Sequence, residues 1–234
     1  MTYRLVITPE QINRQQINLD RQQLHYLMRV LRLSNGDRFI AMDGMGSTWL
    51  SEIKEDIAII IESIDTQTEL SVSLSLITAL PKGSGYEQVI RCCTELGVST
   101  FLPVISDRTI LKPSPKKVHR WRKIAIEAAE QSERQVVPTV LEPDKFKQVI
   151  SNSLAVQTKY ICVARKDVPT LWSSLKQQNQ PEIIIATGCE GGWTELEVEK
   201  AIASGFQPVS LGKRILRAIT APIVASSIVT SLHE

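Results

Sequence analysis

From about residue 72 onward, short apolar runs alternate with stretches of helical periodicity, and this alternation restricts the possible folds more than any other feature of the chain. Each apolar run has the length of a strand that is buried on both faces. Strands that alternate with helices favour a largely parallel sheet with helices on both sides, so we expect an α/β fold. The predicted strands are Val72–Ala79, Phe101–Ile105, Tyr160–Ala164, Ile183–Thr187 and Val209–Leu211.

Four helices are expected between and after these strands. One covers about Gly85–Leu96. A second begins at Ser114-Pro115, where an N-cap residue is followed by proline at the first helical position. A third begins at Thr194, because Glu197 stands three residues later and completes a capping box. The last helix runs from Thr220 towards the C-terminus.

The first 70 residues have a different pattern, with one helix and several short strands joined by close turns. Asp20 is a suitable N-cap for the helix. The apolar residues at helical spacing are Leu24, Leu27, Met28 and Leu31. The predicted strands are Arg38–Met42, Thr48–Lys54 and Ile57–Ile64, which is typical of a small β-barrel. We therefore expect a small β-rich domain over residues 1–70 and an α/β domain over residues 71–234.

The formal net charge of +2 hides an uneven distribution. Residues 1–40 carry a net charge of +3, residues 41–77 carry −6 and residues 78–147 carry +4. The segment Arg108–Lys123 contains seven basic residues and no acidic one. The small total excludes a histone-like polycation. Local basic segments are still suited to contacts with RNA phosphates.

The sequence also argues against several common classes of protein. The cysteines form no C-x-x-C pair and the three histidines are far apart, so no metal site is expected. The longest apolar run, Ile57–Ile61, is much shorter than the ~20 residues that cross a membrane. Dinucleotide-binding, P-loop, zinc-hydrolase and serine-hydrolase motifs are absent. We expect a cytoplasmic protein with reduced thiols, no metal and no membrane contact.

Two glycine-containing loops follow strands in the C-terminal third of the chain, at Thr187–Gly192 and Leu211–Arg217. Ligands bind at the carboxyl ends of strands in open α/β sheets, and glycine permits a close approach of the backbone. These residues alone leave two interpretations of the first loop. It is either a ligand-binding loop or a tight strand-to-helix turn with Glu190 as a surface charge.

The two loops resemble a known signature when they are considered together. Gly188-x-Glu190-Gly191-Gly192, followed by Leu211-Gly212-x-Arg214-Ile215-Leu216-Arg217-x-x-Thr220-Ala221, is similar to the C-terminal motif of SPOUT RNA methyltransferases. More narrowly, it resembles the RsmE family. Further blocks resemble that family in the same order, namely His25–Arg32 with Gly36-Asp37, Lys82-Gly83 with Glu87 and Thr94–Val98, and Trp121–Arg134 with Pro138. The match covers nearly the whole chain.

This resemblance implies a PUA-like β-barrel followed by a SPOUT domain with a deep C-terminal trefoil knot. It also implies a homodimer that binds S-adenosylmethionine and methylates N3 of a uridine in the 16S rRNA of the small ribosomal subunit. Such a transfer needs no covalent intermediate, so positioning can dominate catalysis. The expected cofactor-binding residues are Thr187, Gly188, Glu190, Gly191, Leu211, Gly212, Ile215 and Leu216.

Methylation requires that N3 of uracil loses its proton, and an arginine can stabilise the oxyanion that develops. Arg217 is the first catalytic candidate and Arg134 the second. Neither is a base at neutral pH, so the base is not identified. The candidate RNA-binding residues are Arg21, His25, Arg29, Arg32 and Lys82. For the basic helix face the alternative is simple solvation, and Trp121 is expected in the core rather than as a base-stacking platform.

The chain departs from the family pattern at three places. Cys189 stands where proline is usual, Ala218-Ile219 where Thr-Glu is usual, and Pro222 enters the first turn of the final helix, where proline is tolerated. Ser84 likewise stands where an acid is common. We interpret these as lineage variation, because both glycine loops and Arg217 are retained. Two alternatives remain open. One is a SPOUT enzyme that acts on another RNA position, and the other is a catalytically degenerate homologue that binds RNA or ribosomal particles.

Overall fold

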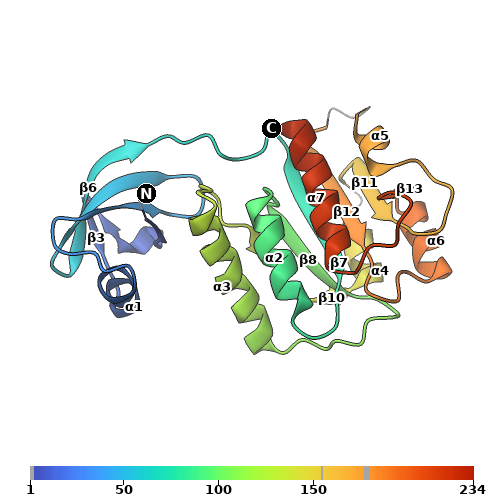
Figure 1. Ribbon diagram of the computed structural model, residues 1–234, viewed down its shortest axis with the longest axis horizontal. Coiled ribbons are helices and arrows are strands. Elements are labelled where there is room, and N and C mark those ends of the chain that lie inside the picture. The colour runs from blue at the N-terminus through green and yellow to red at the C-terminus, as the bar shows by residue number, and fades with distance from the viewer. Residues whose placement is uncertain (1–2, 154, 177–179) are drawn as a thin grey trace. The chain divides into compact units, whose positions relative to one another are not determined.

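The computed structural model describes residues 3–153, 155–176 and 180–234, and these form two compact units (Figure 1). The first unit holds the described residues up to 69 together with 129–137, and the second holds the remainder.

The sequence prediction placed residues 129–137 in the second domain, whereas the structure places them in the first unit. Specific hydrogen bonds account for this difference. The backbone N–H of Val6 donates to Glu130 at 2.7 Å, and the N–H of Val137 donates to the Gly44 carbonyl at 2.9 Å. Contacts between residues so far apart in sequence produce no local sequence pattern, so this part of the domain boundary could not be predicted.

The first unit is built on a six-stranded sheet in the order β1-β4-β5-β6-β3-β2. Its strands are β1 Arg4–Val6, β2 Ile12–Asn13, β3 Gln16–Asn18, β4 Arg38–Met42, β5 Thr48–Lys54 and β6 Ile57–Ile64. β1 and β4 are parallel, and the other neighbours are antiparallel. The three longest strands, β4, β5 and β6, have the predicted bounds, because apolar runs and the turns between them define these strands locally.

The helix of the first unit begins at the predicted residue and changes from an α-helix to a π-helix after His25. Asp20 caps α1 (Arg21–His25) by accepting hydrogen bonds from the N–H groups of Gln22 and Gln23. The next turn, η2 (Tyr26–Val30), is a π-helix. Met28 lies within this turn and is exposed, so its predicted place in the apolar stripe is wrong.

The second unit contains the predicted parallel sheet, in the order β10-β8-β7-β12-β11-β13, with β9 beside β8. Its strands are β7 Ser73–Ala79, β8 Thr100–Ile105, β9 Thr139–Val140, β10 Asp144–Lys145, β11 Thr158–Cys162, β12 Glu182–Thr187 and β13 Gln207–Val209. β11 and β13 end two residues before the predicted ends, so the residues beyond them belong to loops at the carboxyl edge of the sheet.

Helices connect these strands. They are α2 Gly85–Glu95, α3 Pro115–Gln131, α4 Phe146–Asn152, α5 Leu171–Leu175, α6 Glu195–Ala203 and α7 Thr220–His233. The predicted capping box of α6 is present, because the Thr194 side chain accepts from the N–H of Glu197 and the Glu197 carboxylate accepts from the N–H of Thr194. α2 and α7 pack side by side on one face of the sheet (Figure 1).

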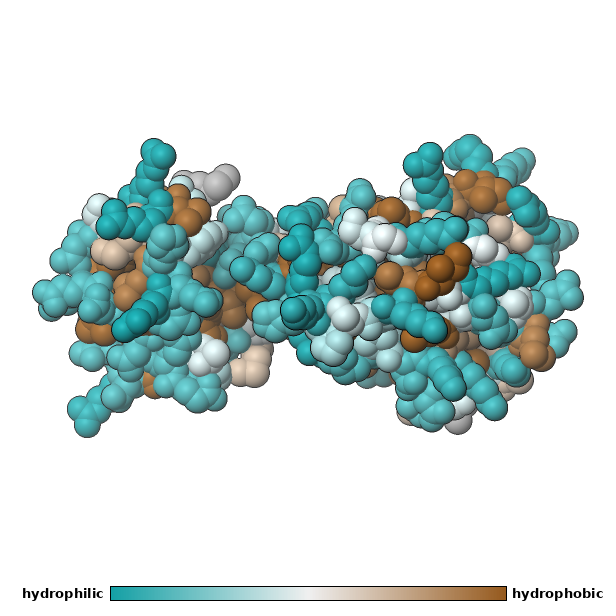
Figure 2. Space-filling view, turned by 90° about the horizontal axis from the view of Figure 1, so that it is seen from below, coloured by the Kyte–Doolittle hydropathy of each residue, from teal (hydrophilic) through white to brown (hydrophobic). Residues whose placement is uncertain are grey.

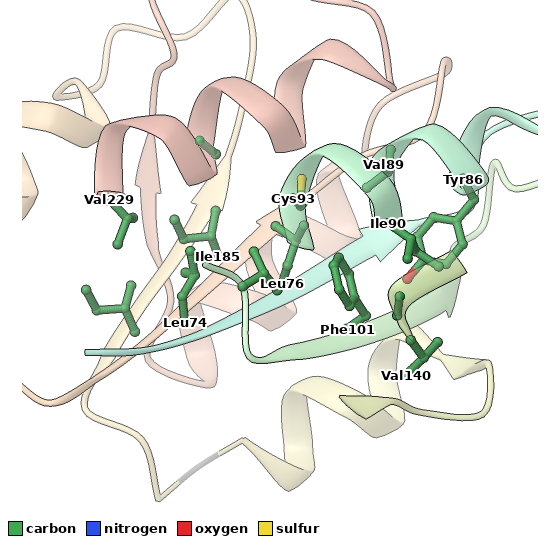
Figure 3. Close-up of a cluster of buried hydrophobic side chains, with 14 of the residues drawn as sticks. Leu74, Leu76, Tyr86, Val89, Ile90, Cys93, Phe101, Val140, Ile185 and Val229 are labelled. Atoms are coloured by element: carbon green, nitrogen blue, oxygen red, sulfur yellow. The ribbon is translucent and has the colours of Figure 1, made fainter. Parts of the chain in front are cut away.

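The two faces of the central strands pack into separate hydrophobic clusters. Leu74 and Leu76 of β7 join α2 and α7 in one cluster (Figure 3), to which α3 also contributes. Ile77 and Ala79 join α4 and α6 in the other cluster. Trp121 is 1% exposed, and its ring meets that of Tyr86 edge-on at 4.7 Å. It is a core residue, which excludes a base-stacking role.

The face of the protein that Figure 2 shows is mostly polar. Figure 2 shows hydrophilic residues over much of the visible face of each unit, with hydrophobic residues in separate patches. Among the described residues, no helix is long and apolar enough to cross a membrane.

Candidate functional site

A pocket of about 350 Å³ lies at the carboxyl ends of β11, β12 and β13. The loops that follow β12 and β13 form much of its wall. Of the eight predicted cofactor-binding residues, seven line this pocket, namely Gly188, Glu190, Gly191, Leu211, Gly212, Ile215 and Leu216. The sheet topology thus brings together two loops that are about twenty residues apart in sequence.

Thr187 is the predicted cofactor-binding residue that does not line the pocket. It is the last residue of β12, and its side chain is fully buried. Its hydroxyl donates to the Ile77 carbonyl at 3.5 Å, inside the sheet. A side chain buried between strands is not available to a ligand, so Thr187 contributes to the sheet instead.

The glycines of the first loop are required by close contacts and by backbone angles. A Cβ on Gly188 would lie 3.1 Å from Gly192 Cα, and a Cβ on Gly191 would lie 3.1 Å from the Arg108 side chain. Gly192 has φ +68°, in the left-handed region that favours glycine. The loop therefore folds tightly on itself and leaves its backbone at the pocket wall.

Glu190 has a definite contact and is not merely a surface charge. Its Oε1 accepts a hydrogen bond from the backbone N–H of Lys82 at 3.0 Å. Lys82 follows β7, so this bond joins the loop after β12 to the loop after the neighbouring strand. The alternative of a simple surface turn for Gly188–Gly192 does not account for this contact.

A second set of contacts joins this loop to the residues after β8. The Arg108 guanidinium donates to the carbonyls of Gly191 at 2.6 Å and Trp193 at 3.2 Å. The buried carboxylate of Glu197 accepts from the N–H of Asp107 at 2.9 Å. Sequence reasoning missed Arg108 and Asp107, although Arg108 opens the acid-free basic segment directly after a predicted strand.

The two catalytic candidates occupy different environments. Arg217 is exposed and stands between Leu216 and Ala218, which both line the pocket. Arg134 belongs to the first unit, is 3% exposed and pairs with Glu69 at 2.6 Å. Because that ion pair already engages its guanidinium, the structure supports a structural role for Arg134, and we do not retain it as a catalytic candidate.

Four of the predicted RNA-binding residues belong to the first unit, and all four are exposed, namely Arg21, His25, Arg29 and Arg32. Lys82 is exposed in the second unit, and its backbone N–H bonds Glu190. These positions suit contacts with solvent or with a polyanion.

The cysteines of the site are not poised for nucleophilic chemistry. Cys162 lines the pocket, and burial raises its pKa to about 12. It is therefore a protonated thiol at neutral pH. Cys189 is buried, with its Sγ 3.8 Å from the Ser106 hydroxyl. The described residues contain no group of three or more His, Cys, Asp or Glu placed to hold a metal ion.

Comparisons with known families identify both units. A model described as an RNA methyltransferase domain matches residues 68–230, and one described as an RNA methyltransferase PUA domain matches residues 19–62. Ribosomal RNA small subunit methyltransferase E of Synechocystis is 50% identical, over 100% of this chain and 79% of that protein. The protein of the same name from Bacillus subtilis is 32% identical, over 99% and 96%.

Solved structures agree with these relatives. Ribosomal RNA small subunit methyltransferase E from Neisseria gonorrhoeae, bound to S-adenosylmethionine, has a TM-score of 0.89 and 31% identity over 100% of this chain and 98% of that chain. A putative methyltransferase from Legionella pneumophila, in complex with the same cofactor, has a TM-score of 0.88 and 26% identity over 99% and 98%. This chain therefore belongs to the family of ribosomal RNA small subunit methyltransferase E, the RsmE family that its motifs resemble.

Proposed function

We propose that this protein transfers a methyl group from S-adenosylmethionine to N3 of a uridine in the 16S rRNA of the small ribosomal subunit. The names of the Synechocystis and Bacillus relatives support a ribosomal RNA substrate, and the Neisseria structure supports the cofactor. The observation that carries the proposal is the pocket that Gly188–Gly192 and Leu211–Leu216 form at the carboxyl ends of β12 and β13.

The residues of this pocket fit the cofactor. Its volume of about 350 Å³ falls within the range of small-molecule sites. Apolar side chains suited to a purine ring line it, namely Leu211, Ile215, Leu216, Ala218 and Ala221. The tight fold of Gly188–Gly192 and the positive φ of Gly212 bring polar backbone groups to the same wall. These groups are the expected hydrogen-bond partners of the adenine and ribose.

When bound, the cofactor supplies an electrophilic methyl group on a sulfonium sulfur. The methyl group forms a bond to N3 of uracil as its bond to sulfur breaks, and the N3 proton leaves to solvent or to a base. Loss of this proton places negative charge on the uracil oxygens. The exposed Arg217, which stands between the pocket residues Leu216 and Ala218, is the group proposed to stabilise that charge. The backbone carbonyl of Arg217 accepts from Thr220 and Ala221, which fixes its place at the start of α7.

The finer features that the resemblance implies belong to the same proposal. The C-terminal part of the second unit would form a trefoil knot, and two copies would assemble as a homodimer in the cytoplasm. Arg21, His25, Arg29 and Arg32 would contact RNA phosphates together with Lys82, which their exposure supports.

Two measurements test the proposal. Titration calorimetry should show binding of S-adenosylmethionine, and the absence of binding would favour a degenerate homologue. Small subunits from a strain that lacks the enzyme should gain 3-methyluridine when incubated with the protein and the cofactor, as read by mass spectrometry of nucleosides. A methyl group on a different nucleoside would favour the alternative of another RNA position.

A further inference from the structure

A third loop of the pocket contains residues that belong to none of the motifs. β11 lies between β12 and β13 in the sheet, so the loop after β11 emerges between the two glycine loops (Figure 1). Ala164, Arg165 and Lys166 of this loop line the same pocket. The sheet order therefore places Arg165 and Lys166 at the pocket, between the loop after β12 and the loop after β13.

The loop is held at both ends by β13 and the residue after it. Before the two cations, the N–H of Val163 donates to the Val209 carbonyl at 2.9 Å. After them, Ser210 donates to the Pro169 carbonyl and accepts from the N–H of Leu171, each at 2.9 Å. Arg165 and Lys166 are exposed between these two anchors, which hold the loop at the carboxyl edge of the sheet.

The charges of the pocket exceed what the cofactor requires. Its lining contains five cationic side chains, Arg108, Arg165, Lys166, Lys213 and Arg214, against two carboxylates, Glu190 and Glu195. Arg108 is engaged by carbonyl groups and Glu190 by a backbone N–H. The side chains of the other four cations make no hydrogen bond or ion pair with a described residue, and all four are exposed.

The cofactor does not account for this surplus. S-adenosylmethionine has a sulfonium, an ammonium and one carboxylate, so its net charge is positive, and a cluster of cations opposes its binding. A polyanion is the ligand that such a cluster attracts. Asp167, the acid that follows Lys166, is exposed and does not line the pocket. Even when it is counted with Glu190 and Glu195, the five cations outnumber the carboxylates.

We propose that Arg165 and Lys166 form a phosphate-binding site of this enzyme, which holds the single-stranded RNA backbone next to the target nucleotide at the mouth of the cofactor pocket. Lys213, on the loop after β13, faces the same pocket and extends the site. This inference rests on the proposed function for the identity of the RNA. It assigns substrate positioning to two residues that lie outside the glycine loops.

The test uses the double variant Arg165→Asn/Lys166→Gln. Asparagine is chosen because Arg165 has φ +59°, a conformation that asparagine tolerates better than most residues. The matched control is Lys145→Gln/Lys147→Gln, which removes two exposed cations from β10 and α4, away from the pocket lining. Fluorescence anisotropy measures the binding of a labelled single-stranded rRNA fragment at several salt concentrations, and calorimetry measures S-adenosylmethionine binding.

The double variant should bind the RNA about tenfold more weakly at moderate salt, and the slope of log affinity against log salt should fall by about 1.4, as two lost phosphate contacts predict. Affinity for S-adenosylmethionine should stay the same, and the control should match the parent. An unchanged RNA affinity would overturn the inference. So would a severalfold loss of cofactor affinity, since the cations would then hold the cofactor's carboxylate.

Failure of the inference is separable from failure of the proposed function. If the parent methylates small-subunit rRNA and the double variant binds RNA normally, only the phosphate site is wrong. If the parent does not methylate rRNA but the double variant loses RNA affinity, the phosphate site stands and the proposed reaction is wrong.

Discussion

The carboxylate of Glu190 accepts a hydrogen bond from the backbone N–H of Lys82, at an Oε1–N distance of 3.0 Å, across 108 positions of sequence. The bond ties the glycine loop after β12 to the loop after β7. Both loops follow parallel neighbouring strands, so the sheet itself brings the two residues together. One side chain of the family motif thus has a structural contact that joins two loops at the carboxyl edge of the sheet, beside the pocket.

Glu190→Ala should weaken S-adenosylmethionine binding about fivefold, the equivalent of about 1 kcal/mol for one exposed hydrogen bond. Glu190→Gln retains the side-chain oxygen and should bind nearly as tightly as the parent. Titration calorimetry compares the three proteins. Equal losses in both variants would show that the negative charge, not the hydrogen bond, is what the cofactor needs.

Glu197 should be important for stability, because its carboxylate is 5% exposed and accepts from the N–H groups of both Asp107 and Thr194. Glu197→Ala leaves both donors unpaired and should lower the free energy of unfolding by about 3 kcal/mol. Urea unfolding measures this, with the exposed Glu199→Ala on the same helix as the control. A loss no larger than that of the control would contradict the assignment.

The ion pair of the buried Arg134 with the partly exposed Glu69 should stabilise the first unit rather than catalyse the reaction. Arg134→Met leaves the Glu69 carboxylate without its cation and should cost about 3 kcal/mol of folding free energy. Adding Glu69→Gln removes the uncompensated charge and should recover part of that loss. Denaturant unfolding compares the variants. If Arg134→Met folds with parental stability but has no turnover, Arg134 acts in catalysis and the structural role is wrong.

Cys93 makes stability depend on alkaline pH. Its side chain is fully buried, and burial raises the pKa of the thiol from 9.0 to about 12. Between these values the unfolded chain loses the proton and the folded protein keeps it, so stability falls as the pH rises above about 9. The slope reaches about 1.4 kcal/mol per pH unit for this thiol.

Unfolding measured from pH 8 upward should show this decline, and Cys93→Ala should reduce its slope although the cavity lowers stability at every pH. Cys92→Ala, at the adjacent partly exposed position, should leave most of the slope in place. Parallel pH profiles for the parent and Cys93→Ala would contradict the role of the buried thiol.

Local signals were enough to predict much of the fold. The apolar run that begins at Ile57 and the capping box of Thr194 and Glu197 each act over a few residues, and the structure has both the strand Ile57–Ile64 and the capped helix. Elements without such signals were missed. β9 and β10 have two residues each and exist because β8 pairs with them, while α4 and α5 span only seven and five residues.

In the candidate site, too, features with a local sequence signal were predicted and features that depend on the strand order were not. The glycines of the two loops were predicted, because their motif and their place after strands are local properties. The contacts of Arg108 with Gly191 and of Lys82 with Glu190 depend on which strands become neighbours, and no periodicity reveals that order. The same holds for Arg165, whose relation to the pocket follows from the position of β11 between β12 and β13.

Ala218 and Ile219, which depart from the family pattern after Arg217, are both packed against other residues of the second unit. Ile219 approaches the helix start at Gly85 so closely that a Cβ on Gly85 would lie 2.8 Å from the Ile219 side chain. Ala218 is buried and lines the pocket. These apolar residues pack where the family pattern has polar ones, which is consistent with a retained site rather than a lost one.

The proposed reaction is uridine-N3 methylation of small-subunit rRNA, with Arg217 as the residue that stabilises the uracil oxyanion. The direct measurement is mass spectrometry of small-subunit rRNA from a deletion strain that carries no gene copy, the parent gene or the Arg217→Ala gene. We predict that 3-methyluridine is absent without the gene and restored by the parent. The purified Arg217→Ala protein should bind the cofactor normally and turn over about 100-fold more slowly. Persistence of 3-methyluridine in the strain without the gene would contradict the account.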